Sequence, residues 1–381
     1  MPLKILFVDD EPDLESLILQ KFRHRIREGD LEFVFASNGQ DALDKLRADA
    51  SLEIVFSDIN MPVMDGLTLL TRIGELNRLL RTIIVTAYDD MQNIRTAMNR
   101  GAFDFLTKPI DFQDFEQTLA KTRAELDTIR EALSHKEQLF ALHSELSIAS
   151  RIQQSILPSE FPQDPRYEIY AEMLPARTVG GDFYDFFAIS DRLVGFAIGD
   201  VSGKGIPAAL YMAVSRTLLR GAALQSATPQ ACLETVSRLL GGQRSGEMYV
   251  TLLYGVLDVE TGAVDFAVAG QTPPFLIKAS GETVLFRDVR GTMLGLFDDV
   301  EVGTCHLTLQ AGETLLLYTD GVSDAENTDG VHFTQRRLEQ TLRAAGRTAR
   351  QTVESVLAKL ESFRGDATQN DDVTVMALRY R

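Results

Sequence analysis

Hydrophobic and polar residues alternate in two different patterns along the first third of the chain. Short runs of β-branched and aromatic residues, typical of buried strands, are separated by stretches whose apolar residues recur at helical spacing. The runs are Lys4–Val8, Leu31–Ala36, Glu53–Ser57, Thr82–Thr86 and Phe103–Thr107. Five such strand and helix repeats predict an α/β fold with a parallel sheet covered on both faces, in which ligands bind at the carboxyl ends of the strands.

The pattern changes between about residues 111 and 157, where Pro and Gly are absent and long charged side chains dominate. One apolar series recurs every seventh residue, and a second is shifted in phase. The first contains Leu119, Leu126, Leu133 and Phe140, and the second contains Leu139, Leu142, Leu146, Ala149 and Ile156. This spacing predicts a helical coiled coil with a phase slip near residues 133–142. The alternative is an amphipathic helix packed on its own chain.

From about residue 158 to 381, strand patterns dominate and a few helices intervene. The predicted strands are Leu193–Gly199, Tyr249–Val259, Ala263–Ala269, Thr314–Thr319 and Val373–Tyr380. The predicted helices are Ile206–Ala223, Pro229–Leu240, Gln335–Ala345 and Ala349–Phe363. We therefore expect an N-terminal domain at 1–120, a helical connector at 111–157 and an α+β domain at 158–381.

Composition and charge narrow the class of function. Apolar residues make up 45% of the chain, enough for sizeable cores, and the formal net charge is −17. Such an acidic surface repels nucleic acid and anionic membranes, which counts against a DNA-binding output. The sequence offers no signal peptide and no apolar run long enough to span a bilayer, so a cytoplasmic protein is expected. Cys232 and Cys305 are far apart and are interpreted as buried apolar residues.

Five polar residues fall at the ends of the predicted parallel strands. Asp9 and Asp10 end the first strand, Asp58 the third, Thr86 the fourth and Lys108 the fifth. Three carboxylates suit Mg²⁺, which keeps several waters and bridges to a phosphoryl group. Asp58 can attack phosphorus and form an acyl phosphate, while Lys108 and Thr86 would bind the transferred oxygens.

On these residues, and on the segment Met61–Gly66, residues 1–120 resemble response-regulator receiver domains. The resemblance implies a flavodoxin-like fold and phosphorylation of Asp58 by a sensor histidine kinase. It implies Mg²⁺ held by Asp9, Asp10, Asp58 and the backbone carbonyl of Asn60, and switch residues Thr86, Phe105 and Lys108.

Four short motifs in the last part of the chain each combine an aspartate with a glycine or another turn-forming residue. They are Gly180–Asp185, Gly199–Gly205, Tyr318–Val322 and Asn370–Thr374. If their strands meet in one sandwich, the carboxylates converge on a shared metal site, where bound ions would hold a phosphate and activate a water. No histidine lies in any motif, which disfavours a zinc hydrolase, and oxygen ligands favour Mg²⁺ or Mn²⁺.

These motifs and the preceding segment Ala149–Pro158 make residues 148–381 resemble the PPM phosphatases, in particular the bacterial SpoIIE/RsbU-like branch that acts on anti-sigma-factor antagonists. The resemblance implies a β-sandwich flanked by helices, with two metal ions. Its implied metal ligands are Asp182, Asp200, the backbone carbonyl of Val201, Asp320 and Asp371, with Asp200, Asp320 and Asp371 the catalytic positions. A metal-activated water would attack phosphoserine or phosphothreonine directly.

Two departures from the family pattern stand out. Gln271 occupies a position where relatives usually carry His, which puts local substrate or loop contacts in doubt. No basic residue is clearly placed to hold the substrate phosphate. Lys204 is a candidate by proximity, and an exposed, solvated lysine is the interpretation we favour there.

Together, the motifs predict a response regulator whose phosphorylation at Asp58 controls a metal-dependent serine/threonine phosphatase. The resemblance implies an anti-sigma-factor antagonist as substrate, in a partner-switching pathway, and the connector implies a homodimer. One alternative is an inert phosphatase-like adaptor that binds and sequesters a signalling partner. Another takes Gly180–Phe183 as part of a cyclic-dinucleotide synthase, but Phe183 stands where such an enzyme needs an acidic residue. The direction of the switch stays open.

Overall fold

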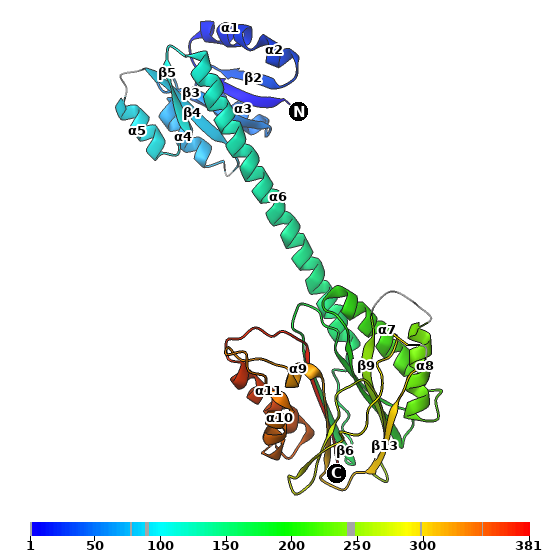
Figure 1. The fold of residues 1–381 in the computed structure, drawn as a ribbon. Helices are drawn as coiled ribbons and strands as arrows, with labels where there is room; N and C mark the ends of the chain where they lie inside the picture. The colour runs from blue at the N-terminus through cyan, green and yellow to red at the C-terminus, as the bar shows by residue number, and fades with distance from the viewer. Residues whose placement is uncertain (1, 77, 88–90, 242–247, 298, 345) are drawn as a thin grey trace. The chain divides into compact units, whose positions relative to one another are not determined.

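The computed structural model describes every residue except 1, 77, 88–90, 242–247, 298 and 345. The chain forms two compact units, Met1–Phe140 and Ala141–Arg381. One helix, α6 (Phe112–Ile156), contributes residues to both of them (Figure 1). Within the described residues, no helix is both long enough and apolar enough to cross a membrane.

The described residues of the N-terminal unit form a five-stranded parallel sheet in the order β2-β1-β3-β4-β5. The strands are β1 (Leu3–Val8), β2 (Leu31–Ala36), β3 (Leu52–Asp58), β4 (Arg81–Ala87) and β5 (Asp104–Lys108). The helices are α1 (Pro12–Lys21), α2 (Arg23–Arg27), α3 (Gly39–Ala48), α4 (Gly66–Gly74) and α5 (Met91–Asn99). The predicted strands agree with these bounds to about one residue, and the flavodoxin-like fold is confirmed.

Both faces of this sheet are covered, because successive residues of a strand point to opposite faces. Phe7 and Phe56 pack on one face with Phe115 of α6, and the ring centroids of Phe56 and Phe115 are 4.4 Å apart. Leu6 belongs to the core on the other face, together with residues of α3 and α4. The strands are therefore apolar along their length, which is why the sequence shows continuous apolar runs.

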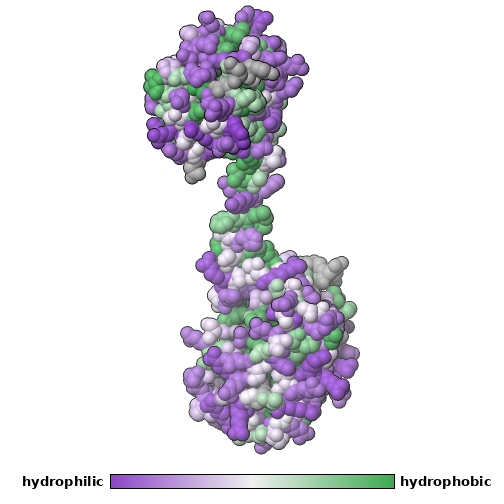
Figure 2. Space-filling model, turned by 90° about the vertical axis from the view of Figure 1, so that its left-hand side faces the viewer, coloured by the Kyte–Doolittle hydropathy of each residue, from purple (hydrophilic) through white to green (hydrophobic). Residues whose placement is uncertain are grey.

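The first turns of α6 belong to the core of the N-terminal unit. Leu119 and Leu126 are buried there, whereas Leu133 and Phe140 are 49% and 77% exposed. These residues form one heptad series, so a helix packed on its own chain describes the first half of the series. Leu133 and Phe140, the exposed half of the series, are available for a coiled coil, which stays a prediction. Figure 2 shows hydrophobic side chains on the visible surface of α6.

In the C-terminal unit, the described residues form two antiparallel sheets, ordered β13-β10-β9-β8-β7 and β12-β11-β14-β15-β6. The strands are β6 (Tyr167–Leu174), β7 (Phe183–Ala188), β8 (Leu193–Val201), β9 (Val250–Asp258), β10 (Ala263–Ala269), β11 (Phe275–Ile277), β12 (Thr283–Leu285), β13 (Gly303–Thr308), β14 (Thr314–Tyr318) and β15 (Val373–Tyr380). The helices are α7 (Ile206–Ala223), α8 (Pro229–Gly241), α9 (Asp320–Ser323), α10 (Thr334–Arg343) and α11 (Ala349–Arg364). Ala345, the predicted end of one helix, lies outside the described residues.

The two sheets pack face to face, with helices outside them (Figure 1). Phe196 of β8, Leu317 of β14 and Met376 of β15 belong to one core, which therefore lies between the sheets. Leu316 points the other way from its neighbour Leu317 and packs with α10 and α11, while α7 and α8 contact the strands of the first sheet. The predicted sandwich flanked by helices is confirmed.

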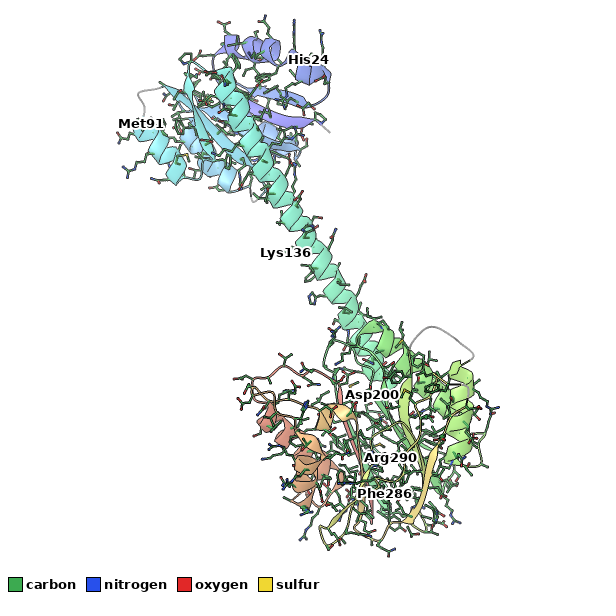
Figure 3. All side chains as sticks on the ribbon, in the orientation of Figure 1. His24, Met91, Lys136, Asp200, Phe286 and Arg290 are labelled. Carbon is green, nitrogen blue, oxygen red and sulfur yellow. The ribbon has the colours of Figure 1, made fainter. Side chains whose placement is uncertain are left out.

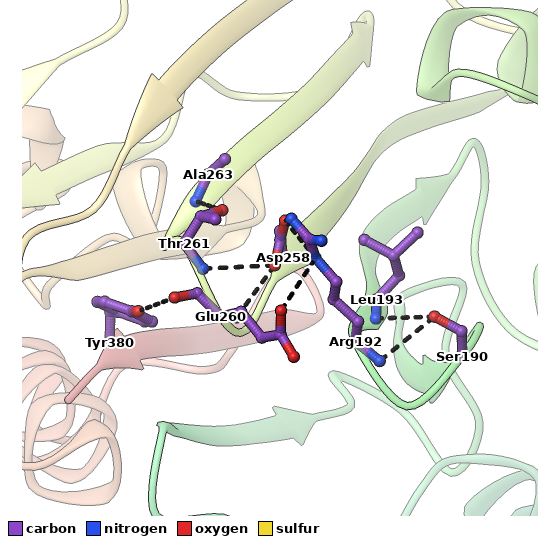
Figure 4. A network of polar contacts seen from close by, with 8 residues as sticks. All are labelled: Ser190, Arg192, Leu193, Asp258, Glu260, Thr261, Ala263 and Tyr380. Atoms are coloured by element: carbon purple, nitrogen blue, oxygen red, sulfur yellow. Dashed lines mark hydrogen bonds and ion pairs between the residues drawn. The ribbon is translucent and has the colours of Figure 1, made fainter.

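Polar contacts hold two turns together at the opposite end of β8 from Asp200 (Figure 4). Arg192, just before β8, pairs with Asp258 at the end of β9, and its Nε lies 2.8 Å from Oδ2. The same carboxylate accepts hydrogen bonds from the backbone N–H groups of Glu260, at 3.0 Å, and Thr261, at 3.4 Å. The hydrogen bond from Arg192 is the main reason that the pKa of Asp258 lies below its usual range.

Val63, in the loop after β3, has a left-handed backbone conformation with φ of 68°, and its side chain is 84% exposed. This conformation costs an L-residue roughly 1–2 kcal/mol, and an exposed valine offers no packing in return. Val63→Asn should raise the free energy of unfolding of the N-terminal unit by about 1 kcal/mol, because Asn tolerates this conformation.

Scanning calorimetry of the full chain measures this change, with Val63→Ala as the matched control. Alanine removes the exposed side-chain atoms but keeps the Cβ that makes a positive φ unfavourable. The Asn variant should therefore unfold at a higher temperature than the Ala variant. Equal transition temperatures for the two variants would show that the loop is not strained at Val63.

Candidate metal and phosphoryl-transfer sites

An acidic pocket lies at the carboxyl edge of the parallel sheet in the N-terminal unit. Asp9 and Asp10 follow β1, and Asp58 is the last residue of β3, which pairs with β1. One oxygen of each carboxylate lies within 4.8 Å of the others. Among the described residues, no other three His, Cys, Asp or Glu side chains bring their ligand atoms this close together. The carboxylate oxygens of this group are suitable ligands for Mg²⁺.

Lys108, at the end of β5, places its ammonium group among these carboxylates. Its Nζ lies 2.7 Å from Asp58 Oδ2, 2.9 Å from Asp9 Oδ2 and 3.0 Å from Glu11 Oε1. Burial lowers the pKa of Lys108, but the bonds to Asp58, Asp9 and Glu11 outweigh it, so the pKa lies above its usual value. Burial raises the pKa of Asp9 despite Lys108. The pocket therefore combines hard oxygen ligands with a fixed positive charge, as binding of a phosphoryl group requires.

Two of the three predicted switch residues, Thr86 and Phe105, differ in their exposure to solvent. Thr86, in β4, is 1% exposed, and its Oγ1 has no hydrogen-bond partner among the described residues. Phe105, in β5, is 39% exposed, so its ring lies at the surface. The backbone N–H of Asn60 donates to Asp58 Oδ1 at 3.3 Å. A free, buried hydroxyl in the strand beside Asp58 can bind an oxygen added to that residue.

A second group of carboxylates forms where the two antiparallel sheets meet. In the first sheet Phe183 pairs with Gly199, so Asp182 lies beside Asp200. In the second sheet β14 ends where its neighbour β15 begins, so Asp320 lies beside Asp371. Figure 3 shows Asp200 close to α9, the short helix that begins at Asp320.

Asp182 links the two sheets. Its side chain is almost fully buried, with 1% of the residue exposed, and its Oδ2 accepts hydrogen bonds from the hydroxyl groups of Thr319 and Thr374, both at 2.7 Å. Thr319 follows β14 and Thr374 lies in β15, so both donors come from the second sheet. Because a buried carboxylate needs compensating donors, these two hydroxyls fix its oxygen in place.

Repulsion between these carboxylates is strong. Burial, and then the charges of Asp320 and Asp371, raise the pKa of Asp200 to about 7. Burial and the charge of Asp200 raise the pKa of Asp182 well above its usual value, and burial and the charge of Asp371 raise that of Asp320. A divalent cation would relieve this repulsion, and the oxygen donors suit Mg²⁺ or Mn²⁺.

Lys204 supplies positive charge at this site. Its Nζ lies 3.2 Å from Asp371 Oδ2 and also contacts the carbonyl of Asn370, and its charge offsets a small part of the rise in the pKa of Asp320. Lys204 is exposed, as expected, and its ammonium is paired with Asp371, a predicted metal ligand that is itself about half exposed. The carboxylates lie farther apart than those around Asp58, since no three of them meet the 4.8 Å spacing among the described residues.

Glycines of the motifs leave room around the site. A Cβ added to Gly181 would lie 2.7 Å from the carbonyl oxygen of Val201, and one added to Gly321 would lie 1.9 Å from that of Asp372. Any larger residue at Gly181 would therefore crowd the Val201 carbonyl, which the family resemblance makes a metal ligand. The space and the donor set fit a bound divalent ion.

Sequence reasoning missed the role of Asp372. Its Oδ1 accepts a hydrogen bond from the N–H of Ala176 at 2.7 Å, and its Oδ2 accepts one from Gly181 at 2.6 Å. Asp372 thus holds the backbone that leads into Asp182. The only signal in the sequence is the pair Asp371–Asp372 before a strand. The sequence does not indicate which of the two carboxylates faces the site and which binds the backbone.

Two further motif residues lie outside the carboxylate group. Asp185 is fully buried and pairs with two arginines of α7, at 3.1 Å from Arg216 and 2.7 Å from Arg220, so its role is to attach β7 to α7. Gln271 is 7% exposed, its Oε1 accepts a hydrogen bond from the N–H of Thr272, and its Nε2 has no partner among the described residues.

Comparison with known proteins identifies both parts of the chain. The family described as Stage II sporulation protein E (SpoIIE) matches residues 190–381, and the response regulator receiver domain matches residues 5–120. The chain belongs to the SpoIIE family and carries an N-terminal receiver domain.

Individual relatives agree with this assignment. Protein IcfG of Synechocystis sp. is 29% identical over 261 residues, which cover 61% of this chain and 41% of IcfG. The phosphoserine phosphatase RsbU of Bacillus subtilis is 27% identical over 241 residues, covering 62% of this chain and 70% of RsbU. The SiaA-PP2C domain of Pseudomonas aeruginosa shares the fold, with a TM-score of 0.55 and 23% identity, over 64% of this chain and 99% of that domain.

The raised pKa of Asp200 predicts how the metal-free protein responds to pH. In the folded state Asp200 holds its proton up to about pH 7, whereas in the unfolded chain it releases it near 3.8. Asp200 therefore favours folding at low pH, and this contribution is lost as the pH rises from about 4 to 7. Between pH 5.5 and 8 the loss is roughly 1–2 kcal/mol.

Thermal unfolding in EDTA should show Asp200→Asn gaining stability relative to the unmodified protein as the pH rises over this range. Mn²⁺ should raise the unfolding temperature of the unmodified protein at pH 8, less so at pH 5.5, and much less in the variant. If both proteins respond identically to pH and to Mn²⁺, Asp200 is neither strained by its neighbours nor a metal ligand.

Proposed function

We propose that this chain is a response regulator in which phosphorylation of Asp58 controls a metal-dependent protein-serine/threonine phosphatase. The observation that carries the proposal is the group Asp182, Asp200, Asp320 and Asp371, gathered at one end of a PP2C-like sandwich with raised pKa values at three of its members. Carboxylates crowded in this way bind protons or divalent cations, and at neutral pH a cation is the better partner.

In the phosphatase site, the proposed ligands of two Mn²⁺ or Mg²⁺ ions are Asp182, Asp200, Asp320, Asp371 and the carbonyl of Val201. Bound metal supplies a water of lowered pKa, able to attack phosphorus at neutral pH. The hydroxyls of Thr319 and Thr374 both donate to Oδ2 of Asp182 and so would hold its carboxylate in place for a metal ion.

In the receiver, Mg²⁺ would be held by Asp9, Asp10, Asp58 and the carbonyl of Asn60. A sensor histidine kinase would donate the phosphoryl group to Asp58. Lys108, already 2.7 Å from Asp58, would neutralise the added oxygens. The hydroxyl of Thr86, buried and without a partner among the described residues, would then bond to one of them while Phe105 turns inward.

The substrate we propose is a phosphorylated serine or threonine of a partner protein, in particular an anti-sigma-factor antagonist. The likeness to RsbU, a phosphoserine phosphatase, supports this class. The exposed apolar residues of α6 support a homodimer formed through a coiled coil. The domain limits we propose are 1–120 for the receiver, 111–157 for the connector and 158–381 for the phosphatase.

Hydrolysis of p-nitrophenyl phosphate with Mn²⁺ tests the catalytic part of the proposal. Asp200→Ala should lower turnover by at least about 100-fold, because several kcal/mol of metal stabilisation are lost. Asp185→Asn is not a suitable control, since it disrupts a buried ion pair, so the exposed Asp191→Asn is used instead. Metal-independent turnover, or turnover that survives Asp200→Ala, would contradict the proposal.

The regulatory part is tested with acetyl phosphate and Mg²⁺ in the same assay. Turnover should change when acetyl phosphate is added, and the sign of the change gives the direction of the switch. Asp58→Asn should abolish the response while leaving basal turnover intact. If Asp58 is phosphorylated but turnover does not change, the receiver does not control the phosphatase. If no turnover is seen under any condition, the inert adaptor is favoured.

A further inference from the structure

The last turns of α6 contain a buried glutamine that bonds to the backbone next to the phosphatase site. Gln153 is 5% exposed. Its Nε2 donates to the carbonyl of Gly180 at 2.6 Å, and its Oε1 accepts the N–H of the same glycine at 3.1 Å. One side chain therefore satisfies both polar backbone groups of Gly180, a pairing that fixes the position and the orientation of that peptide segment.

Gly180 is also held from its other side. A Cβ added to Gly180 would lie 2.5 Å from Oδ2 of Asp372, so the backbone packs directly against that carboxylate. The same Oδ2 accepts the N–H of Gly181 at 2.6 Å. The two residues before Asp182 are thus clamped between Gln153 and Asp372, and a shift of either partner must move the backbone of Asp182.

The residues after Asp182 have a matching contact. The hydroxyl of Tyr184 donates to the carbonyl of Pro158 at 3.0 Å, two residues beyond the end of α6. Leu157, between these two attachment points, is buried in the core between the sheets. The C-terminal end of α6 and the residues directly after it therefore hold the backbone on both sides of Asp182.

We infer that Gln153 is a positioning residue, through which α6 sets the place of the Asp182 carboxylate and thereby the affinity of the phosphatase site for metal. This inference rests on the proposed function and names its means of regulation. The same helix carries Phe115 in the core of the receiver, so one continuous element reaches from that core to Gly180. A rotation or displacement of α6 would act on Gly180 through the two hydrogen bonds of Gln153.

The adjacent glutamine offers a matched control. Gln154 is exposed, whereas Gln153 is buried. Gln153→Met keeps the length and volume of the side chain and removes both hydrogen bonds. Their loss corresponds to roughly a tenfold change in an equilibrium constant. In the full chain, Gln153→Met should raise the Mn²⁺ concentration needed for half-maximal hydrolysis of p-nitrophenyl phosphate about tenfold. Turnover at saturating Mn²⁺ should largely recover, and Gln154→Met should behave as the unmodified protein.

Mn²⁺ binding is measured separately, from the rise in unfolding temperature during a Mn²⁺ titration. If Gln153→Met is insoluble, Gln153→Glu replaces it, since it keeps the acceptor for the Gly180 N–H and loses the donor. An unchanged Mn²⁺ requirement, or reduced turnover that Mn²⁺ cannot restore, would overturn the inference. If the unmodified protein binds Mn²⁺ but hydrolyses nothing, the proposed function fails, and weaker Mn²⁺ binding by the variant still supports the role of Gln153. An unmodified protein that binds no Mn²⁺ overturns both.

Discussion

Several carboxylates share a small, partly buried volume in the C-terminal unit, and their mutual repulsion is the constraint on which the rest of that unit depends. Burial of Asp182 requires two hydroxyl donors from the opposite sheet, so the two sheets must meet at this point. Asp372 accepts a hydrogen bond from the backbone N–H of Gly181, and Lys204 pairs with the carboxylate of Asp371. Repulsion among buried carboxylates favours the uptake of protons or divalent cations, which relieves it.

The helix α6 has a different role at each of its ends. Near its start, Phe115 stacks on Phe56 of β3 and belongs to the core of the N-terminal unit. Near its end, Gln153 bonds to the backbone before Asp182. The middle of the helix is exposed, and among the described residues Leu133 and Phe140 belong to no core cluster. Each end of the helix is therefore fixed in the core or the backbone of its own unit.

Features that depend on residues close together in the sequence could be predicted from local patterns. The strands of the receiver and the rim residues Asp9 and Asp58 follow from apolar runs and from the rule that parallel strands end at one edge. The roles of Gln153 and Asp372 could not be predicted, because each depends on a contact with a residue far away in the sequence. The short edge strands of the sandwich were missed as well, since β13 alternates half-buried and exposed residues and shows no apolar run.

Hydrogen exchange of the backbone amides in residues 176–182 tests the central claim most directly. The N–H groups of Gly180 and Gly181 are bonded to Gln153 and Asp372, so their exchange reports on the clamp itself. In the full chain, phosphorylating Asp58 with acetyl phosphate should change their exchange rates, and Asp58→Asn should show no change. Phosphorylation that alters phosphatase turnover while leaving these exchange rates untouched would contradict the account.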